Sequence, residues 1–307
     1  MTTNQQVAIG IDLGGTNIKG VLVDADGTVI NSLTAATNDK GSDSADVWRT
    51  SIFDMEEELK RFSKKPVSAI GLAAPGLPDQ NNQSIAYMPG RLQGLENFNW
   101  AHFFDDNDSA LSVINDGQAA LMAESAFGAG QEIKNIIMLT LGTGVGGGIM
   151  INGEIYQGHI QRAGHLGHIT VNSHGKQGIT NMPGSLEEAI GNASLPRRSL
   201  GKFNSTMKLV EAYQKGETLA TTVWLESVRN LAVGLSSLIN AFSPEIIILG
   251  GGITKAVKAL FDPLDEFLAL YEWRPGGIKT PVKPAAFDKF AGAMGAAIYA
   301  MKTVEKS

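Results

Sequence analysis

Glycine-rich turns that directly follow apolar segments are the feature of this sequence best suited to binding a ligand. The first is Gly14-Gly15-Thr16, which follows the apolar residues 7–13 and has Asp12 directly before it. Glycine lets the backbone turn tightly and aim its N–H groups at an anion, and the Thr16 hydroxyl adds one more donor. The Asp12 carboxylate repels phosphate, but it can hold Mg²⁺ or the water around the ion. This motif alone fits a plain hairpin with a surface aspartate equally well.

Two further glycine turns favour an anion site over the plain hairpin. Apolar residues 136–141 lead into one of them and apolar residues 246–249 into the other. Ligands of α/β proteins bind where the strands end. Two facing glycine hairpins, one in each half of the chain, would clamp a polyphosphate. The residues of these two turns with the required backbone freedom or hydroxyl group are Gly142, Thr143, Gly144, Gly146, Gly251 and Gly252.

The first two turns belong to an internal repeat. Residues 11–16 align with residues 139–144, 128 positions later, and each copy continues into a second apolar segment and an Asp-Gly or Asn-Gly turn. Such dipeptides favour two-residue hairpins. Two copies of one strand–turn–strand unit predict two lobes of similar topology.

The elements around these turns alternate between strands and helices. Apolar, β-branched runs predict strands over 7–13, 18–24, 28–30, 67–72, 111–114, 136–141, 149–151, 246–249 and 282–287. Apolar residues at helical spacing predict helices over 44–62, 118–127, 224–242, 256–270 and 291–301. Residues 79–107 are polar, with Pro and Gly among them, and predict irregular structure. The alternation predicts α/β layers.

Composition excludes several classes of protein. The 307 residues contain no cysteine, which excludes disulfide frameworks, thiolate zinc sites and cysteine nucleophiles. The net charge of −6 argues against a partner held through a phosphate backbone, such as nucleic acid. No apolar run reaches the length of about 18 residues that a membrane span needs, and residues 1–6 lack a secretory pattern. We therefore expect a soluble cytoplasmic protein without a membrane partner.

Three long segments of the chain resemble the ROK family, a group of bacterial sugar kinases and related repressors. They read IGIDLGGTNIKGVLVDADG, LTLGTGVGGGIMINGEIYQG and LAVGLSSLINAFSPEIIILGGGIT, and the resemblance extends from Val7 to about Met301. It implies an α/β architecture, the two-lobed actin-like or ribonuclease H-like ATPase fold. We expect a small lobe over 1–117, with a C-terminal helix 291–307 packed back on it, and a large lobe over 118–290. The repressors carry an N-terminal helix-turn-helix, whereas the first strand here begins at Val7, which favours a kinase.

The resemblance also implies the roles of individual residues. Asp116, behind the strand 111–114, would be the general base that takes a proton from a primary sugar hydroxyl. ATP would be the phosphoryl donor, with Mg²⁺ near Asp12, held through water. The implied sugar ligands are Asn115, Asp116, His165, His168 and Glu187. The implied phosphate ligands are Gly14, Gly15, Thr16, Gly142, Thr143, Gly144 and Gly146, with Gly251 and Gly252 beside the adenosine.

The sequence departs from the family pattern at two places. His165 replaces the glutamate of a Glu-x-Gly-His motif, and a neutral imidazole offers fewer acceptor sites than a carboxylate. The family's three zinc-binding cysteines fall on Gly178, Thr180 and Ser185, so no zinc is expected. A site made only of histidines stays open as an alternative, from His159, His165, His168 and His174.

Several alternatives remain at this level. Glucose is the default substrate, and fructose, mannose, allose and N-acetylmannosamine are other candidates. The donor is either ATP or polyphosphate, because polyphosphate-using members also lack the cysteine motif. A sugar-sensing pseudokinase is a separate possibility, and a homodimer or homotetramer is expected. Lys19 is expected as a solvated strand residue, Glu188 as helix surface, and residues 196–198 as a surface turn.

Overall fold

The computed structural model describes residues 6–40, 44–104 and 109–306. Three parts of the sequence predictions lie outside these ranges. They are residues 1–5, where no secretory leader is expected, residues 105–107 of the segment expected to be irregular, and Ser307 at the end of the expected C-terminal helix. The chain divides into two compact units. Unit 1 combines the described residues of Met1–Glu132, Ile155–Gly164 and Ala286–Ser307, and unit 2 combines Ile133–Glu154 with His165–Ala285.

Hydrogen bonds explain why distant segments join unit 1. The Glu124 carboxylate accepts from the backbone N–H groups of Ala286 and Phe287, at 3.1 and 2.7 Å. The Gln161 amide donates to the carbonyl of Asp79 at 2.9 Å. Both ties join later segments of the chain to residues before 133. The division therefore falls after Glu132, later than the boundary at 117 that the sequence predicts.

The sheet of unit 1 has five strands in the order β3-β2-β1-β4-β7. Strands β1 (Val7–Leu13), β2 (Asn17–Asp24) and β3 (Val29–Ala36) are antiparallel neighbours, as the apolar runs and the glycine turns predict. Strands β4 (Ala69–Ala74) and β7 (Ala110–Asn115) run parallel to β1. The carboxyl ends of three parallel strands thus meet at one edge of this sheet.

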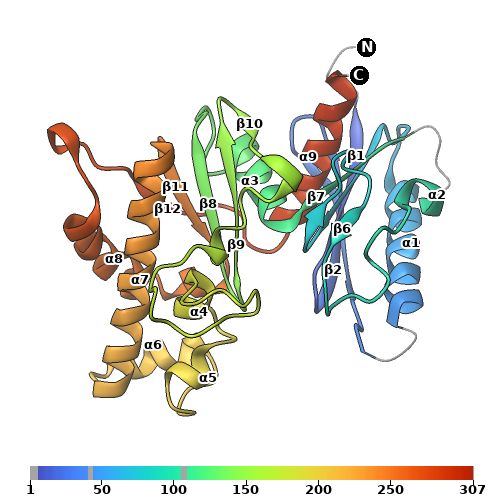
Figure 1. The fold of residues 1–307 in the computed structure, drawn as a ribbon. Helices are drawn as coiled ribbons and strands as arrows, with labels where there is room; N and C mark the ends of the chain where they lie inside the picture. Colours follow the sequence, from blue (N-terminus) through green and yellow to red (C-terminus); the bar gives the residue numbers. More distant parts are fainter. Residues whose placement is uncertain (1–5, 41–43, 105–108, 307) are drawn as a thin grey trace. The chain divides into compact units, whose positions relative to one another are not determined.

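Helices cover both faces of this sheet (Figure 1). Helix α1 (Ser44–Phe62) packs on β2, with Met55 and Leu59 over Gly20. Helices α3 (Asp116–Phe127) and α9 (Ala291–Lys306) pack on the opposite face and against each other. A Cβ atom on Gly10 or Gly71 would overlap with the α9 backbone, so these glycines permit close helix–sheet contact.

Short elements fill the segment between β4 and β7, which the sequence predicts as irregular. They are β5 (Leu77–Pro78), β6 (Ile85–Tyr87) and α2 (Trp100–Phe104). The 3₁₀ turn η2 (His159–Gln161) contacts β5. Trp48 of α1 packs against Phe98 and Trp100, with ring centroids 6.2 and 5.9 Å apart, so an aromatic cluster anchors this segment to unit 1.

Unit 2 repeats the sheet of unit 1. Its strand order is β10-β9-β8-β11-β12, with β8 and β9 antiparallel and β8, β11 and β12 parallel. The bounds are β8 (Ile136–Leu141), β9 (Val145–Ile151), β10 (Glu154–Ile155), β11 (Ile246–Gly250) and β12 (Val282–Pro284). Each strand has a counterpart at the same place in the other sheet. The predicted internal repeat is therefore confirmed.

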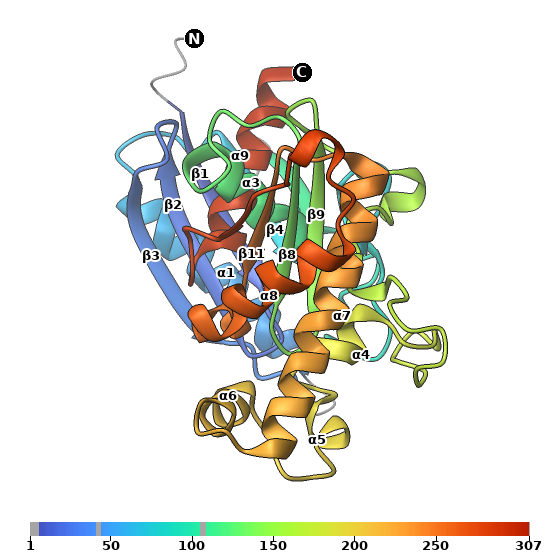
Figure 2. The ribbon, with the colours of Figure 1, turned by 90° about the vertical axis from the view of Figure 1, so that its left-hand side faces the viewer.

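Helix α7 (Thr218–Phe242) packs against α4 (Leu186–Ile190), α6 (Thr206–Gln214) and α8 (Lys258–Tyr271), as Figure 2 shows for unit 2. Helix α5 (Leu195–Arg198) and the 3₁₀ turns η3 (Leu166–His168), η4 (Gly252–Ala256) and η5 (Pro275–Gly277) complete the unit. Helix α7 begins before the predicted residue 224 because its first turns also bury apolar side chains, including Ala220 and Val223. None of the helices in the described ranges combines the length and apolar character needed to cross a bilayer.

Candidate functional site

The first glycine turn closes the β1–β2 hairpin and is braced from behind. The N–H of Gly14 donates to the carbonyl of Asn17 at 3.1 Å. The buried Thr37 donates its hydroxyl to the Gly14 carbonyl at 2.6 Å and its N–H to the Thr16 carbonyl at 3.0 Å. Within the described ranges, the N–H groups of Gly15 and Thr16 have no backbone or side-chain acceptor. The turn thus holds two donors ready for an anion.

Asp12 lies at the end of β1, directly before this turn. It is the cross-strand partner of Lys19, whose Nζ is 3.9 Å from Asp12 Oδ2. Lys19 is thus paired with a carboxylate, whereas the sequence suggests a solvated lysine. Loss of hydration, and after it the Asp116 carboxylate, raise the pKa of Asp12 to about 6, and the charge of Lys19 limits this rise. The α9 residue Gly292 closes the other side, where a Cβ would lie 2.8 Å from Asp12 Oδ2.

Strand pairing brings Asp116 to the same edge of the sheet as Asp12. Asp12 is paired with Ala73 of β4, and the next β4 residue, Ala74, is paired with Asn115 of β7. Asp116 follows at once as the first residue of α3. The Asp116 carboxylate contributes to the raised pKa of Asp12, which agrees with this proximity.

Asn115 and Asp116 form the start of α3 and not a separate turn. Asn115 is buried, and its Oδ1 accepts from the N–H groups of Gly117 and Gln118 at 2.9 and 3.3 Å. Its Nδ2 donates to the Gly76 carbonyl at 3.1 Å. Asn115 is therefore the N-cap that fixes the direction of Asp116, and both of its polar atoms already have partners in the protein.

Asp116 is accessible to a substrate although protein crowds its carboxyl group. The residue is exposed, and its Oδ1 accepts from the Gly117 N–H at 2.8 Å. Loss of hydration raises its pKa, and the Gly117 N–H, Asn115 and the charge of Arg91 oppose the rise. A carboxylate with a raised pKa is a stronger base than an ordinary aspartate.

Arg91 is the residue of this site that the sequence does not reveal. Its guanidinium lies over Gly15, where an added Cβ would overlap with it. Arg91 belongs to a loop with no periodic pattern, so only the fold of the loop places it there. The sole sequence signal is that a basic residue follows the dipeptide Pro89-Gly90 in the segment 79–107.

The second glycine turn closes the β8–β9 hairpin and faces a carboxylate. The N–H of Gly142 donates to the Gly144 carbonyl at 2.9 Å. The Oε2 atom of Glu187 accepts from the Val145 N–H at 3.0 Å, and a Cβ on Gly144 would overlap with this carboxylate. Glu187 and Gly144 are therefore in contact in unit 2, although the sequence places Glu187 at the sugar and Gly144 at a phosphate. A phosphate on this turn would compete with Glu187 for the Val145 N–H.

The third glycine run lies beside the second turn. Gly250 of β11 is paired with Thr140 of β8, and the next residue, Gly251, has a φ of 88°. A Cβ on Gly251 would also overlap with the Leu141 carbonyl, so only glycine fits there. Gly252 has open space around it. Both residues expected at the adenosine thus follow a strand adjacent to the second turn.

His165 directly precedes η3 and His168 is its last residue, and η3 packs on β9. Their rings are stacked with centroids 6.2 Å apart. Loss of hydration, and after it the charge of His168, lower the pKa of His165 to about 4, so His165 is neutral at physiological pH. Its Nε2 is buried and has no hydrogen-bond partner in the described ranges.

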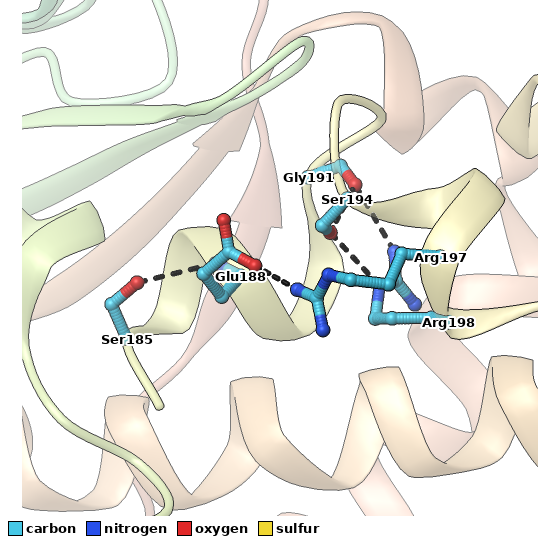
Figure 3. Close-up of polar contacts among 6 residues, drawn as sticks. All are labelled: Ser185, Glu188, Gly191, Ser194, Arg197 and Arg198. Carbon is cyan, nitrogen blue, oxygen red and sulfur yellow. Dashed lines mark hydrogen bonds and ion pairs between the residues drawn. The ribbon is translucent and has the colours of Figure 1, made fainter. Parts of the chain in front are cut away.

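A helix cap and an ion pair occupy the segment where the family's cysteines would lie (Figure 3). Ser185 caps α4, with its Oγ accepting from the Glu188 N–H at 3.3 Å, and the Glu188 carboxylate pairs with Arg197. Glu188, expected as plain helix surface, therefore joins α4 to α5. Gly178, another of the cysteine positions, lies beside Ser185 and Glu188. Over the described ranges, no three His, Cys, Asp or Glu side chains gather as a metal site.

Arg198 is held in the same cluster by neutral groups. Its guanidinium donates to the Ser194 hydroxyl at 2.9 Å and to the Gly191 carbonyl at 3.1 Å (Figure 3). It also donates to the Ser227 hydroxyl at 2.6 Å. Loss of hydration, followed by the charge of Arg197, lowers the pKa of Arg198 to about 10. The residues 196–198, expected as a surface turn, belong to helix α5, and its two arginines contact α4 and the residue that caps it, Gly191.

The structure thus gathers the predicted residues into two groups. In unit 1, Asp12, the Gly14–Thr16 turn and Asp116 lie at one sheet edge, and Arg91 joins them. In unit 2, the Gly142–Gly146 turn lies beside Gly251 and Glu187, and the histidines of η3 lie against β9.

The Asp12 position fits a magnesium ion. Mg²⁺ uses one or two carboxylates, keeps several waters and takes phosphate oxygens, so a full cage of protein ligands is not required. Burial first, and repulsion by the Asp116 carboxylate second, raise the pKa of Asp12. A divalent cation there would relieve this repulsion.

Comparisons with known proteins identify the class. The model of the ROK family matches residues 8–303, so the chain belongs to the ROK family. The glucokinase of Thermotoga maritima is 29% identical, over 94% of this chain and 95% of its own length.

Solved structures agree with this assignment. The crystal structure of ROK hexokinase from Thermus thermophilus has a TM-score of 0.86 and 28% identity, and the match covers 98% of this chain and 100% of that one. A ROK family glucokinase from Streptomyces griseus, solved with glucose and AMPPNP, has a TM-score of 0.78 and 26% identity, covering 96% and 99% of the two chains. The two-lobed actin-like ATPase fold expected from the sequence is confirmed.

Proposed function

We propose that this protein is an ATP-dependent sugar kinase that phosphorylates a primary hydroxyl of a hexose, with glucose as the first candidate. The observation that carries the proposal is in unit 1, where Asp116 lies beside Asp12 and the braced Gly14–Thr16 turn. A base, an anion-binding turn and a carboxylate suited to Mg²⁺ are the parts that phosphoryl transfer to an alcohol requires. Membership of the ROK family and the named relatives support the same class.

In the proposed reaction, Asp116 accepts the proton of the sugar hydroxyl. The hydroxyl oxygen forms a bond to the terminal phosphorus of ATP, while the bond from that phosphorus to its bridging oxygen breaks and ADP leaves. The raised pKa of Asp116 favours this proton transfer, and its place on the Asn115-capped start of α3 fixes the direction of approach. Mg²⁺ at Asp12, when bound, neutralises charge on the phosphate oxygens.

Each unit contributes its own set of ligands in this proposal. The free N–H groups of Gly15 and Thr16 receive phosphate oxygens. In unit 2, the Gly142–Gly146 turn and Gly251–Gly252 serve the nucleotide, and His165, His168 and Glu187 serve the sugar. A sugar hydroxyl that donates to the buried Nε2 of His165 would satisfy an atom that otherwise lacks a partner.

A panel of sugars tests the proposal. Glucose, fructose, mannose, allose and N-acetylmannosamine are each incubated with Mg²⁺ and ATP, and phosphorylated product is measured together with coupled ADP release. The same panel with polyphosphate in place of ATP identifies the donor. The kinase proposal is supported if at least one sugar is turned over and Asp116→Asn abolishes this turnover. Sugar binding without turnover on the whole panel contradicts the proposal.

A sugar- and nucleotide-binding sensor is the second candidate, and one observation favours it. The Glu187 carboxylate occupies the Val145 N–H of the second turn, which weakens that turn as a phosphate site. A sensor would bind glucose and AMPPNP in calorimetry and release no ADP with any sugar. Location in the cytoplasm and assembly as a homodimer or homotetramer stay predictions.

A further inference from the structure

Arg91 is a cation of unit 1 that the proposed reaction has not used. It lies in the loop between β6 and α2, and the residue is exposed. A cavity of about 470 Å³ opens at this loop, lined by Asp39 and by residues between 88 and 96. Within the described ranges, the guanidinium of Arg91 makes no ion pair and no hydrogen bond.

The two carboxylates that line this cavity are engaged elsewhere. Asp39 Oδ2 accepts from the Leu92 N–H at 3.0 Å, and Glu96 Oε1 accepts from the Met88 N–H at 2.6 Å. Both acids therefore shape the loop backbone around Arg91, and neither forms an ion pair with it. Five N–H donors on a planar fork stay available for an external anion.

The loop itself is firmly anchored, so the position of Arg91 is set by the fold. Leu92 and Leu95 are buried in the core of unit 1. Arg49 donates to the Gly94 carbonyl at 2.6 Å, and its guanidinium lies 4.1 Å from the centre of the Phe98 ring. A residue on such a loop loses little freedom when it binds a ligand.

Two independent observations place the Arg91 charge between the turn and the base. The guanidinium occupies the space over Gly15 that a Cβ would need, next to the free N–H groups of Gly15 and Thr16. Its positive charge also reaches Asp116. An anion on the turn and a proton acceptor at position 116 would thus have the same guanidinium as a neighbour.

We infer that Arg91 binds the terminal phosphoryl group of the donor and stabilises its negative charge during transfer. This inference rests on the proposed kinase function. Guanidinium groups match phosphate oxygens in a two-pronged geometry, and a cation supplied within the chain at this point strongly accelerates phosphoryl transfer. Glycine at position 15 is then required because any side chain would displace this cation from the turn.

The test compares Arg91→Ala and Arg91→Lys with Arg61→Ala, an exposed arginine at the end of α1. We expect Arg91→Ala to lower kcat by about 10² to 10³, as for the loss of one preorganised donor. The Kd for sugar alone, measured by calorimetry, stays unchanged. Arg91→Lys falls in between because an ammonium keeps the charge without the fork. Added guanidinium ion restores part of the activity of Arg91→Ala, which a merely structural residue would not allow, and Arg61→Ala behaves as wild type.

Two results would overturn the inference. One is an Arg91→Ala enzyme whose kcat and donor KM stay within about threefold of wild type. The other is a loss confined to sugar affinity, which would make Arg91 a sugar ligand. Wild-type turnover reports separately on the kinase proposal. If the wild type binds AMPPNP but turns over no sugar, a Kd for AMPPNP weakened by about tenfold in Arg91→Ala supports the inference, and an unchanged Kd overturns it.

Discussion

The two glycine turns share a backbone topology and differ in charge. One closes β1–β2 with Leu13 opposite Ile18, and the other closes β8–β9 with Leu141 opposite Val145. The turn of unit 1 lies under the Arg91 guanidinium, whereas the turn of unit 2 lies against the Glu187 carboxylate. The repeated hairpin therefore supplies donors twice, but the residues packed on it decide how strongly each turn attracts an anion.

This difference separates the roles of the two units. In unit 1, the Arg91 guanidinium, which has no ion pair in the described ranges, and the Asp12 carboxylate lie at the turn, and in the proposed reaction this favours the transferring phosphoryl group. In unit 2 the carboxylate keeps one N–H occupied, so that turn suits the less charged part of the nucleotide or a sugar hydroxyl. Four changes test this comparison.

Removing Asp116, the proposed base in unit 1, gives the largest expected effect. Asp116→Asn keeps the shape of the side chain but cannot accept the proton, so we expect kcat to fall by at least about 10². Steady-state rates on the sugar that turns over best measure this, with the melting temperature as a check on folding. Near-unchanged turnover would remove Asp116 from the mechanism.

Asp12 tests whether a cation completes the turn of unit 1. The raised pKa of about 6 means that Asp12 is ionised above pH 6 and gains a proton as pH falls through 6. We expect the apparent affinity for Mg²⁺ to be full above this value and to fall by about tenfold per pH unit below it. The effect is measured by determining the reaction rate as a function of Mg²⁺ concentration at several pH values between about 5 and 8, a range that spans this pKa. In Asp12→Asn the affinity for Mg²⁺ should be low at every pH. A pH dependence of this affinity that persists in the variant would contradict the placement of Mg²⁺ at Asp12.

Matched glycine substitutions compare the two turns directly. Gly15→Ala places a methyl group where the Arg91 guanidinium lies, whereas a Cβ on Gly142 meets no atom within 4 Å. We expect Gly15→Ala to lower kcat by about tenfold and Gly142→Ala to leave it near wild type. Combining Gly15→Ala with Arg91→Ala should be no worse than Arg91→Ala alone. Equal losses in the two glycine variants would show that the contact with Arg91 is irrelevant.

The smallest expected effect concerns the carboxylate of unit 2. Glu187→Ala removes the acceptor of the Val145 N–H, and we expect the free energy of unfolding to fall by about 1 kcal/mol. Urea denaturation measures this, and the exposed Glu211→Ala on α6 is a matched control. An unchanged stability would mean that water replaces Glu187 at the turn, and the contrast between the two turns would then be weaker than we propose.

Patterns of neighbouring residues predicted much of the fold. The apolar runs before Gly14 and Gly142 predicted both hairpins, and their similarity predicted the repeated sheet. The proximity of Asp12 and Asp116 needed a third strand between them, because β4 joins β1 to β7. No local pattern encodes that register, since it depends on contacts between residues far apart in the chain.

The sequence by itself determined where the backbone turns, which segments are buried and which carboxylates follow strand ends, because these depend on side-chain type and spacing. Tertiary structure decided the charges that each turn meets. Arg91 reaches Gly15 only because Leu92 and Leu95 anchor its loop, and Glu187 reaches Val145 only because α4 packs beside β9. Electrostatic interactions act through space, so residues remote in sequence set the chemistry of turns that the sequence alone makes look alike.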